Sequence, residues 1–344
     1  MVQVNRRILT VVAALLPVVV LAAVGTAVTV PFVALGPGPT FNTLGELDDR
    51  QVVDVQGAQL DPTTGNLNMT TVSVLDGITI FEAFAFWASG SYGLVPRSQI
   101  YPPGLSREEI EQSHQREFEN SEGNAEIAAL RHLDLPVVTL VNRVSETGPA
   151  DGVLRVGDEL VGIDGTPITT PEDVVATISS RTPGSPATVV YRRDTVERTT
   201  RIVLGAHPDD ATKGFLGIGL RAGARPPLRV TFNLAEVGGP SAGLMFSLAV
   251  IDKLSPGELT GGRFVAGSGT IDPDGTVGPI GGIQYKMITA REDGAQTFLV
   301  PAANCAEARQ RTPEGLRLVK VDDLAGAVQS LEDLAAGKEP ASCG

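Results

Sequence analysis

The pentapeptide Gly239-Pro240-Ser241-Ala242-Gly243 is the most informative stretch of this sequence. It follows the pattern G-x-S-x-G, in which a serine lies on a tight, glycine-flanked turn before a helix. Residues 241–254 are apolar on nearly every side of the helix that they predict, so this helix is expected to be buried. Its first turn would present unpaired backbone N–H groups and the positive end of the helix dipole, which together can stabilise an oxyanion.

A serine hydroxyl becomes a nucleophile only when a base takes its proton, so the next question is which base is available. In α/β-hydrolases the histidine follows the serine, but here all three histidines precede Ser241, namely His114, His132 and His207. Lys286 is the best alternative because it follows the glycine-rich turn at residues 278–283 and begins a helix. An apolar setting lowers the pKa of a lysine and favours the neutral amine.

Length, charge and composition exclude several classes of protein. A chain of 344 residues suffices for two or three domains with buried cores. The net charge of −13, from 27 basic and 40 acidic residues, argues against a nucleic-acid partner. Neither a P-loop nor a metal-ligand spacing occurs, so no cofactor and no metal is expected. Cys305 and Cys343 either pair in an oxidising compartment or remain two free thiols.

The N-terminal residues differ from the rest of the chain. Arg6 and Arg7 are followed by 28 residues without a charge, 8–35. Roughly 20 apolar residues suffice for a helix that crosses a bilayer, so residues 8–35 predict a transmembrane helix that ends at the Gly-Pro-rich stretch 36–40. The two arginines place residues 1–7 in the cytoplasm and the remaining domains outside the cell membrane. A cleaved signal peptide is the alternative, since small residues near position 25 suit a peptidase.

Residues 36–130 predict a mixed strand and helix region to which the sequence assigns no role. Short strands are expected between about residues 50 and 80, among them 69–74, and a buried apolar helix is expected at 81–87. Ser106 and Glu109 form a capping box, which predicts that a helix begins there and continues to residue 133.

Residues 131–205 form a compact unit of strands with one helix. The order of G-P-A at 148–150, L-x-x-G-D-E-L at 154–160 and I-D-G at 163–165 resembles the core of a PDZ domain. Thr170 and Pro171 predict the start of its groove helix, 171–179. The resemblance implies strand addition of an extended peptide, with the carboxylate-binding loop near residues 133–138, although no G-L-G-F-like loop is visible. The alternative is a structural spacer. Residues 206–214 are expected to be a linker.

Residues 215–344 alternate strand and helix. Their G-P-S-A-G at 239–243, with P-I-G-G-hydrophobic-x-x-K at 279–286 and V-P-x-x-N at 300–304, resembles the proteolytic domain of Lon-type serine proteases. This resemblance implies that Ser241 is the nucleophile and Lys286, 45 residues later, the general base. Gly238 stands where the family often has an aspartate. The family's T-G-E element is replaced by residues 266–270, so either Ser268 or Thr270 is expected to support the lysine.

The whole chain thus resembles a bacterial membrane-anchored PDZ-Lon protease, an α+β multidomain protein with a transmembrane helix, a PDZ-like β-rich domain and a Lon-type α/β proteolytic domain. The resemblance implies an ATP-independent serine endopeptidase that forms an acyl-enzyme through a Ser–Lys dyad. It also implies unfolded or extended substrates and association into a homo-oligomer. The alternative is a membrane-tethered, peptide-binding scaffold with an inactive protease domain. A histidine-dependent esterase fails on residue order unless His207 is recruited in another topology.

Overall fold

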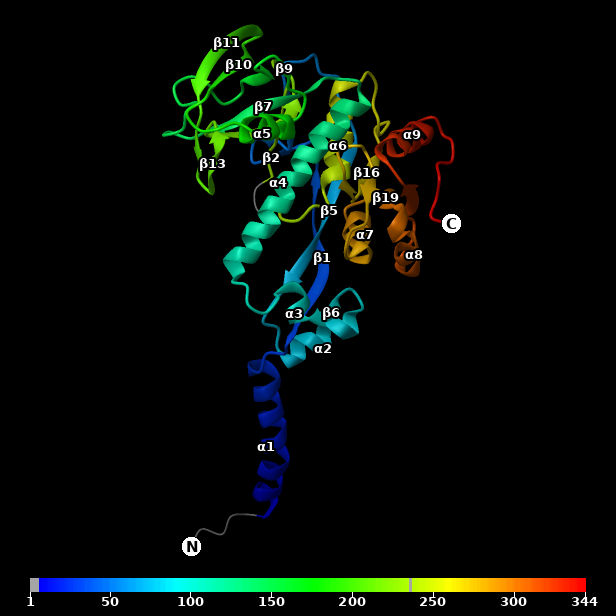
Figure 1. Ribbon diagram of the computed structural model, residues 1–344. Coiled ribbons are helices and arrows are strands. Elements are labelled where there is room, and N and C mark those ends of the chain that lie inside the picture. Colours follow the sequence, from blue (N-terminus) through cyan, green and yellow to red (C-terminus); the bar gives the residue numbers. More distant parts are fainter. Residues whose placement is uncertain (1–5, 235–236) are drawn as a thin grey trace.

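The computed structural model describes residues 6–234 and 237–344, and it confirms the predicted α+β multidomain fold class (Figure 1). A single apolar helix leads into a body built on a mixed six-stranded sheet, and a second sheet lies beside this body. The long helix α4 (Arg107–His132) runs between the two sheets. Its N-terminus carries the predicted capping box of Ser106 and Glu109, which is therefore confirmed.

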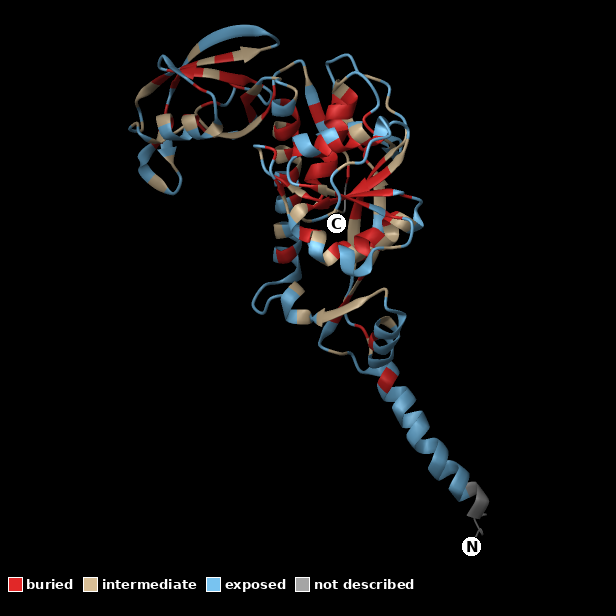
Figure 2. Ribbon diagram, turned by 90° about the vertical axis from the view of Figure 1, so that its right-hand side faces the viewer, coloured by how far each residue is buried: buried red, intermediate tan, exposed pale blue. Residues whose placement is uncertain are grey.

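Helix α1 (Arg6–Ala27) projects from the body and is exposed from Leu9 to Ala27, except at Gly25, which is buried (Figure 2). Its segment Leu9–Ala27 has a mean hydropathy of 2.5, which is apolar enough to cross a membrane, although a signal sequence passes the same test. The predicted helix over 8–35 is too long, because strand β1 (Phe32–Asn42) begins soon after Ala27 and contains the stretch 36–40. An uncharged run carries no signal for this change from helix to strand. Part of the predicted cytoplasmic segment, residues 1–5, lies outside the described residues.

The sheet of the body has the strand order β20-β19-β16-β5-β1-β6. Strand β5 (Asn66–Leu75) contains the predicted strand 69–74 and pairs antiparallel with β1 and parallel with β16 (Phe264–Gly267). Residues 36–130 therefore supply half of a sheet that the C-terminal residues complete, and the predicted proteolytic domain 215–344 does not form this sheet alone. The remaining strands are β6 (Gly93–Pro96), β19 (Thr297–Pro301) and β20 (Arg317–Val321).

The core of the body is built around helix α6 (Gly243–Leu254), which is buried from Gly243 to Lys253, as its all-round apolar sequence predicts. Helix α4 packs against α6, and the rings of Phe118 and Phe246 meet edge to face at 5.8 Å. Helices α7 (Ile283–Glu292) and α9 (Leu324–Ala335) complete the body. Shorter elements are β2 (Glu46–Leu47), β3 (Arg50–Gln51), β4 (Val53–Gln56), β15 (Arg229–Phe232), β17 (Thr270–Ile271), β18 (Val277–Gly278), η1 (Ala302–Asn304), α8 (Cys305–Ala308) and η2 (Arg309–Arg311).

The second sheet has the order β11-β10-β8-β7-β14 and encloses its own apolar core with helix α5 (Pro171–Ser179). The predicted linker 206–214 is wrong: it forms the hairpin of β12 (Gly205–His207) and β13 (Asp210–Phe215), which packs against α5. Strand β14 (Ile218–Ala224) also belongs to this sheet. The predicted start of the proteolytic domain, at residue 215, therefore falls within the second unit. The polar sequence of an exposed hairpin resembles that of a linker. The other strands are β7 (Val137–Val144), β8 (Glu159–Ile163), β9 (Thr166–Pro167), β10 (Pro186–Arg193) and β11 (Val196–Val203).

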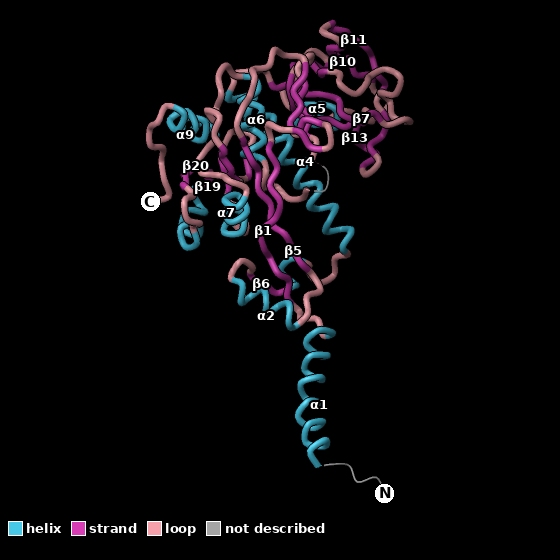
Figure 3. The backbone as a smooth tube through the Cα atoms, turned by 180° about the vertical axis from the view of Figure 1, so that it is seen from behind, coloured by secondary structure: helices cyan, strands magenta, loops and turns pink. Residues whose placement is uncertain are grey.

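A small layer lies between α1 and the body, where β1 and β5 extend toward α1 (Figure 3). It contains helix α2 (Ile80–Ser89), strand β6 and helix α3 (Arg97–Ile100). The predicted helix at 81–87 is present as part of α2, but the prediction that it is buried is wrong. Ala83 is buried, whereas Phe84 is 64% and Trp87 is 68% exposed. Hydrophobic sequence alone does not distinguish a core helix from one whose apolar face is exposed.

Candidate active site

Ser241 lies on the turn that precedes α6, which begins two residues later than predicted, at Gly243. Gly239 has a φ of 87°, and its N–H donates to the carbonyl of His114 at 3.1 Å. Gly243 faces the body so closely that a Cβ there would lie 2.5 Å from Ile271 Cγ2. Both glycines are therefore required by the backbone. Within the described residues, no acceptor is found for the backbone N–H groups of Ser241 and Ala242, which leaves both free to bind an oxyanion.

Lys286, on the first turn of α7, reaches Ser241 from the other side of the site. Its Nζ lies 2.8 Å from Ser241 Oγ and 2.8 Å from Ser268 Oγ, and it donates to the carbonyl of Thr70 at 3.0 Å. The lysine is only 3% exposed. Burial lowers the pKa of Lys286 to about 7, because an ammonium loses its solvation there. The structure thus brings the two predicted site residues into hydrogen-bond distance.

The hydrogen bonds around Lys286 favour one arrangement of protons. The carbonyl of Thr70 can only accept. The hydroxyl of Ser268 donates to the carbonyl of Ser241 at 3.0 Å, so its oxygen is left to accept from Lys286. A neutral amine has two N–H groups, which these two acceptors use. Its lone pair then faces Ser241 Oγ and is placed to accept that hydroxyl proton.

The residues that support Lys286 come from segments far apart in sequence. Of the two candidates, Ser268 contacts the lysine, whereas Thr270 lies in β17 and pairs with Gly278 of β18. Asn304, from the V-P-x-x-N element, holds the turn before α7. Its side chain accepts from the N–H of Ile280 and donates to the carbonyl of the same residue, both at 2.9 Å. Asn304 thereby fixes the direction in which α7 starts.

A cleft of about 430 Å³ opens beside Ser241 and Lys286. One wall is the G-P-S-A-G turn, and the opposite wall comes from β1 and β5 through Pro39, Phe41 and Thr71. The sequence assigned no role to residues 36–130, yet they line this cleft and supply the Thr70 carbonyl. No motif marks them, because a strand sequence does not reveal its neighbours. Among the described residues, no histidine side chain is hydrogen-bonded to Ser241, and no group of acidic, histidine or cysteine residues could hold a metal.

The edge of the second sheet that lies beside α5 is formed by a different strand from the predicted one. Strand β7 is paired on both sides, with β8 and with β14, so a peptide cannot add to it near residues 133–138. The edge strand next to α5 is β14, and β11 forms the other edge of the sheet. Residues Phe215-Leu216-Gly217-Ile218 lead into this strand, with Gly217 at φ 75°. The carboxylate-binding loop was expected near residues 133–138 and no G-L-G-F-like loop was recognised in the sequence, whereas this stretch of similar composition precedes the edge strand β14.

Comparison with known proteins assigns these two units. Residues 235–331 match the family model of the Lon protease (S16) C-terminal proteolytic domain, and residues 116–204 match that of the PDZ domain. The chain therefore carries a PDZ domain and a Lon-type serine protease domain, together with one N-terminal apolar helix. Neither matched region alone covers half of the chain.

Individual proteins are similar to parts of this chain. A Lon protease of Phenylobacterium zucineum is 30% identical over 37% of this chain and 15% of its own length. A probable periplasmic serine endoprotease DegP-like of Ectopseudomonas mendocina is 29% identical over 34% of this chain and 25% of its own length. The chain therefore spans a quarter or less of these relatives. A PDZ domain structure of an SdrC-like protein from Listeria monocytogenes is 25% identical and covers 24% of this chain and 86% of its own, with a TM-score of 0.23.

Proposed function

We propose that this protein is a membrane-anchored, ATP-independent serine endopeptidase in which Ser241 and Lys286 form the catalytic dyad. The observation that carries the proposal is the 2.8 Å contact between Ser241 Oγ and the buried Lys286 Nζ. A lysine with a pKa of about 7 supplies a neutral amine near neutral pH, as a general base requires.

In the proposed reaction, Lys286 Nζ takes the hydroxyl proton as Ser241 Oγ attacks the peptide carbonyl carbon. The oxyanion of the tetrahedral intermediate is bound by the backbone N–H groups of Ser241 and Ala242. Lys286 then gives its proton to the leaving amine, and the C–N bond breaks to leave an acyl-enzyme. A water molecule, deprotonated by Lys286, attacks the ester and releases the carboxylate product, and the proton returns to Ser241.

The PDZ domain is proposed to bind substrates by strand addition at the open edge of β14, beside α5. The main chain leads from this strand, which ends at Ala224, to Ser241 of the cleft. A segment that binds as a strand and enters the cleft must be extended, so the proposed substrates are unfolded or extended polypeptides. Association of copies into a homo-oligomer is proposed from the resemblance to Lon-type domains, and no nucleic-acid partner is proposed.

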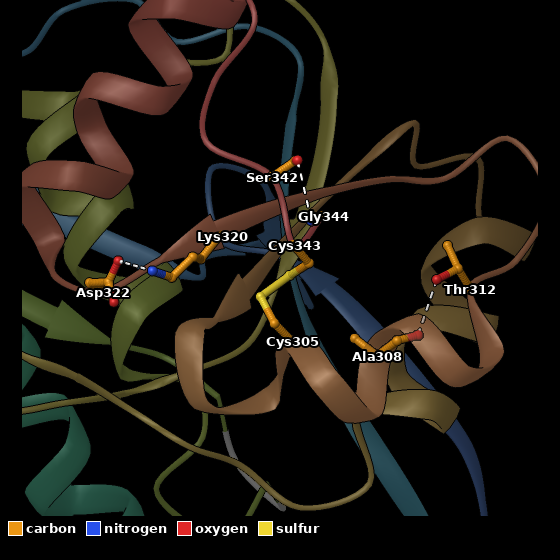
Figure 4. The surroundings of a disulfide bond; sticks show 8 residues. All are labelled: Cys305, Ala308, Thr312, Lys320, Asp322, Ser342, Cys343 and Gly344. Atoms are coloured by element: carbon orange, nitrogen blue, oxygen red, sulfur yellow. Dashed lines mark hydrogen bonds and ion pairs between the residues drawn. A yellow bond between two sulfur atoms is a disulfide. The ribbon is translucent and has the colours of Figure 1, made fainter.

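Anchoring by α1, with residues 1–5 and their basic neighbours in the cytoplasm, places the protease domain outside the cell membrane in this proposal. The disulfide between Cys305 and Cys343 supports that side, since such bonds persist in oxidising compartments (Figure 4). The disulfide also resolves the alternative of two free thiols that the sequence left open.

Hydrolysis of casein and of unstructured peptides by the full chain in detergent tests the proposal. Cleavage is expected for the wild type and for Lys320→Ala, which changes a half-exposed surface lysine. It should be lost in Ser241→Ala and in Lys286→Met, which keeps the buried apolar stem. Full activity of the Lys286→Met protein would exclude the dyad. If the folded wild type binds peptides but never cleaves them, the protein is instead a membrane-tethered scaffold with an inactive protease domain.

A further inference from the structure

Helix α2 carries an apolar face that the rest of the protein covers only in part. Ile80, Phe81, Phe84 and Trp87 follow the spacing of one helix face, and they are 38%, 47%, 64% and 68% exposed. The other side of the helix holds it in place, since Ala83 is buried and the ring of Phe86 packs on Tyr92 at 4.6 Å. The exposed face is therefore a fixed surface of the folded protein.

Helix α2 lies at the C-terminal end of α1 (Figures 1 and 3). Two backbone hydrogen bonds join the end of α1 to the start of α2: Val30 N–H donates to Ile78 at 2.9 Å, and Ile80 N–H donates to Val28 at 3.2 Å. Phe81 packs so closely on α1 that a Cβ on Gly25 would lie 2.5 Å from its ring. A bilayer that α1 crosses must end near this junction.

The chemistry of the face fits the boundary between lipid tails and headgroups. Tryptophan and other aromatic rings concentrate at that level of a membrane, and amphipathic helices lie in it with their apolar side inward. No charged side chain lies on the exposed face. The single acidic residue of α2, Glu82, points the other way and accepts from the N–H of Thr79 at 2.7 Å in a capping box.

The distribution of exposed aromatic residues favours a lipid surface over a protein partner. Throughout residues 9–234 and 237–344, exposed phenylalanine and tryptophan side chains occur only at this end of the molecule, at positions 32, 81, 84 and 87. The PDZ domain and the outer surface of the protease domain have none. Such clustering is unusual on a surface that faces water.

We propose that the apolar face of α2 lies in the interfacial layer of the bilayer that α1 crosses, on the side of the protease domain. This inference rests on the proposed membrane anchoring but not on proteolysis. It gives the protease a fixed orientation, because the single strand β1, with an irregularity between Pro37 and Thr40, leads from the layer of α2 to Phe41 in the cleft. At the rise of a regular β-strand, the distance from Phe32 to Phe41 is at most roughly 30 Å, which would hold the cleft no further than that from the membrane.

The single tryptophan of the chain makes the proposal measurable, since all tryptophan fluorescence comes from Trp87. The full chain is reconstituted into vesicles of phosphatidylcholine and phosphatidylglycerol, and flotation first shows whether it is anchored. Phosphatidylcholine brominated at a shallow or a deep acyl position then reports the depth of the indole. The control is the Trp87→Phe, Val175→Trp protein, because Val175 lies on the PDZ domain and is 61% exposed.

For Trp87 we expect a blue-shifted emission, stronger quenching by the shallow than by the deep bromines, and protection from acrylamide in water. The control tryptophan should be quenched by acrylamide and not by brominated lipid. A floated protein whose Trp87 is accessible to acrylamide and unaffected by brominated lipid would overturn the inference. Protection from acrylamide without quenching by lipid would also overturn it, in favour of a second copy or another protein. A chain that does not float refutes the anchoring itself, whatever its proteolytic activity.

Discussion

The carboxylate of Glu126 accepts a hydrogen bond of 2.9 Å from the guanidinium of Arg221, which joins helix α4 of the body to strand β14 of the PDZ domain. Glu126 also accepts from the backbone N–H of Ala224 at 2.7 Å and is only 3% exposed. The edge strand β14 is therefore tied at Ala224 to the helix that packs against α6, so the two domains are linked through a buried carboxylate.

Replacing the carboxylate of Glu126 should destabilise the contact between α4 and β14. Glu126→Ala leaves the N–H of Ala224 buried without an acceptor, so we expect a loss of about 1–3 kcal/mol in the free energy of unfolding. Arg221 is half exposed and can turn to water, which limits the loss. Denaturant unfolding followed by circular dichroism measures it. Glu117→Ala, at an exposed position of the same helix, should change little, and equal effects of the two substitutions would contradict this role.

The pH dependence of cleavage follows from Lys286. Its pKa of about 7 means that the amine is mostly protonated below neutral pH and mostly neutral above it. Only the neutral form can accept the Ser241 proton, so kcat/KM should rise with pH through about 7 and then level off. A series of peptide hydrolysis rates over this range checks it. A kcat/KM that falls as the pH rises through 7 would exclude Lys286 as the base.

Ser268 should act as a positioning residue for Lys286. Ser268→Ala removes an acceptor of the lysine and a donor to the Ser241 carbonyl. We expect kcat to fall roughly tenfold to a hundredfold with KM nearly unchanged, since misplaced reacting groups slow the chemical step. Thr270→Ala is the matched control and should retain activity. If the two variants lose activity equally, the hydrogen bond of Ser268 is not the cause.

Gly281 allows the cleft to be narrowed without strain. It lines the cleft, its φ is ordinary, and a Cβ added there meets no atom within 4 Å. Gly281→Ala should leave KM almost unchanged, whereas Gly281→Phe should raise KM by filling the substrate path. Both proteins should unfold at the same temperature as the wild type. Unchanged KM in the Gly281→Phe protein would mean that substrates do not pass this wall.

The disulfide should stabilise the C-terminal part of the protease domain. It closes a loop with a sequence separation of 38, and the tail it fixes accepts a hydrogen bond from Lys320 N–H to the Ala341 carbonyl at 2.9 Å. Loop-closure entropy predicts that its removal lowers the free energy of unfolding by about 4 kcal/mol. Unfolding with and without reductant measures this loss. Cys343→Ser should show the same loss and no response to reductant. A wild type that reductant leaves unaffected would contradict the prediction.

Several helices of this protein, and where they begin, could be predicted from short stretches of the sequence. The capping boxes at Ser106 and Thr170, the all-round apolar pattern of α6 and the residues before α7 each depend on a few neighbours. The pairing of Ser241 with Lys286 was also predictable, because the order of the histidines excluded the usual base and one lysine stood in a suitable apolar setting.

Tertiary structure alone decided which distant segments surround that pair. The Thr70 carbonyl comes from β5, whose parallel partner β16 lies almost 200 residues away, as in the pairing of Asn68 with Ala266. The cleft wall at Phe41 comes from β1, which pairs with β5. Backbone hydrogen bonds between strands leave no mark in the side-chain pattern of either strand, so the sequence could not show them. For the same reason the peptide-binding strand was expected just after residues 133–138, at β7, although β7 is paired on both sides and β14 forms the edge. The exposure of α2 likewise depends on what packs against it, which its apolar sequence does not specify.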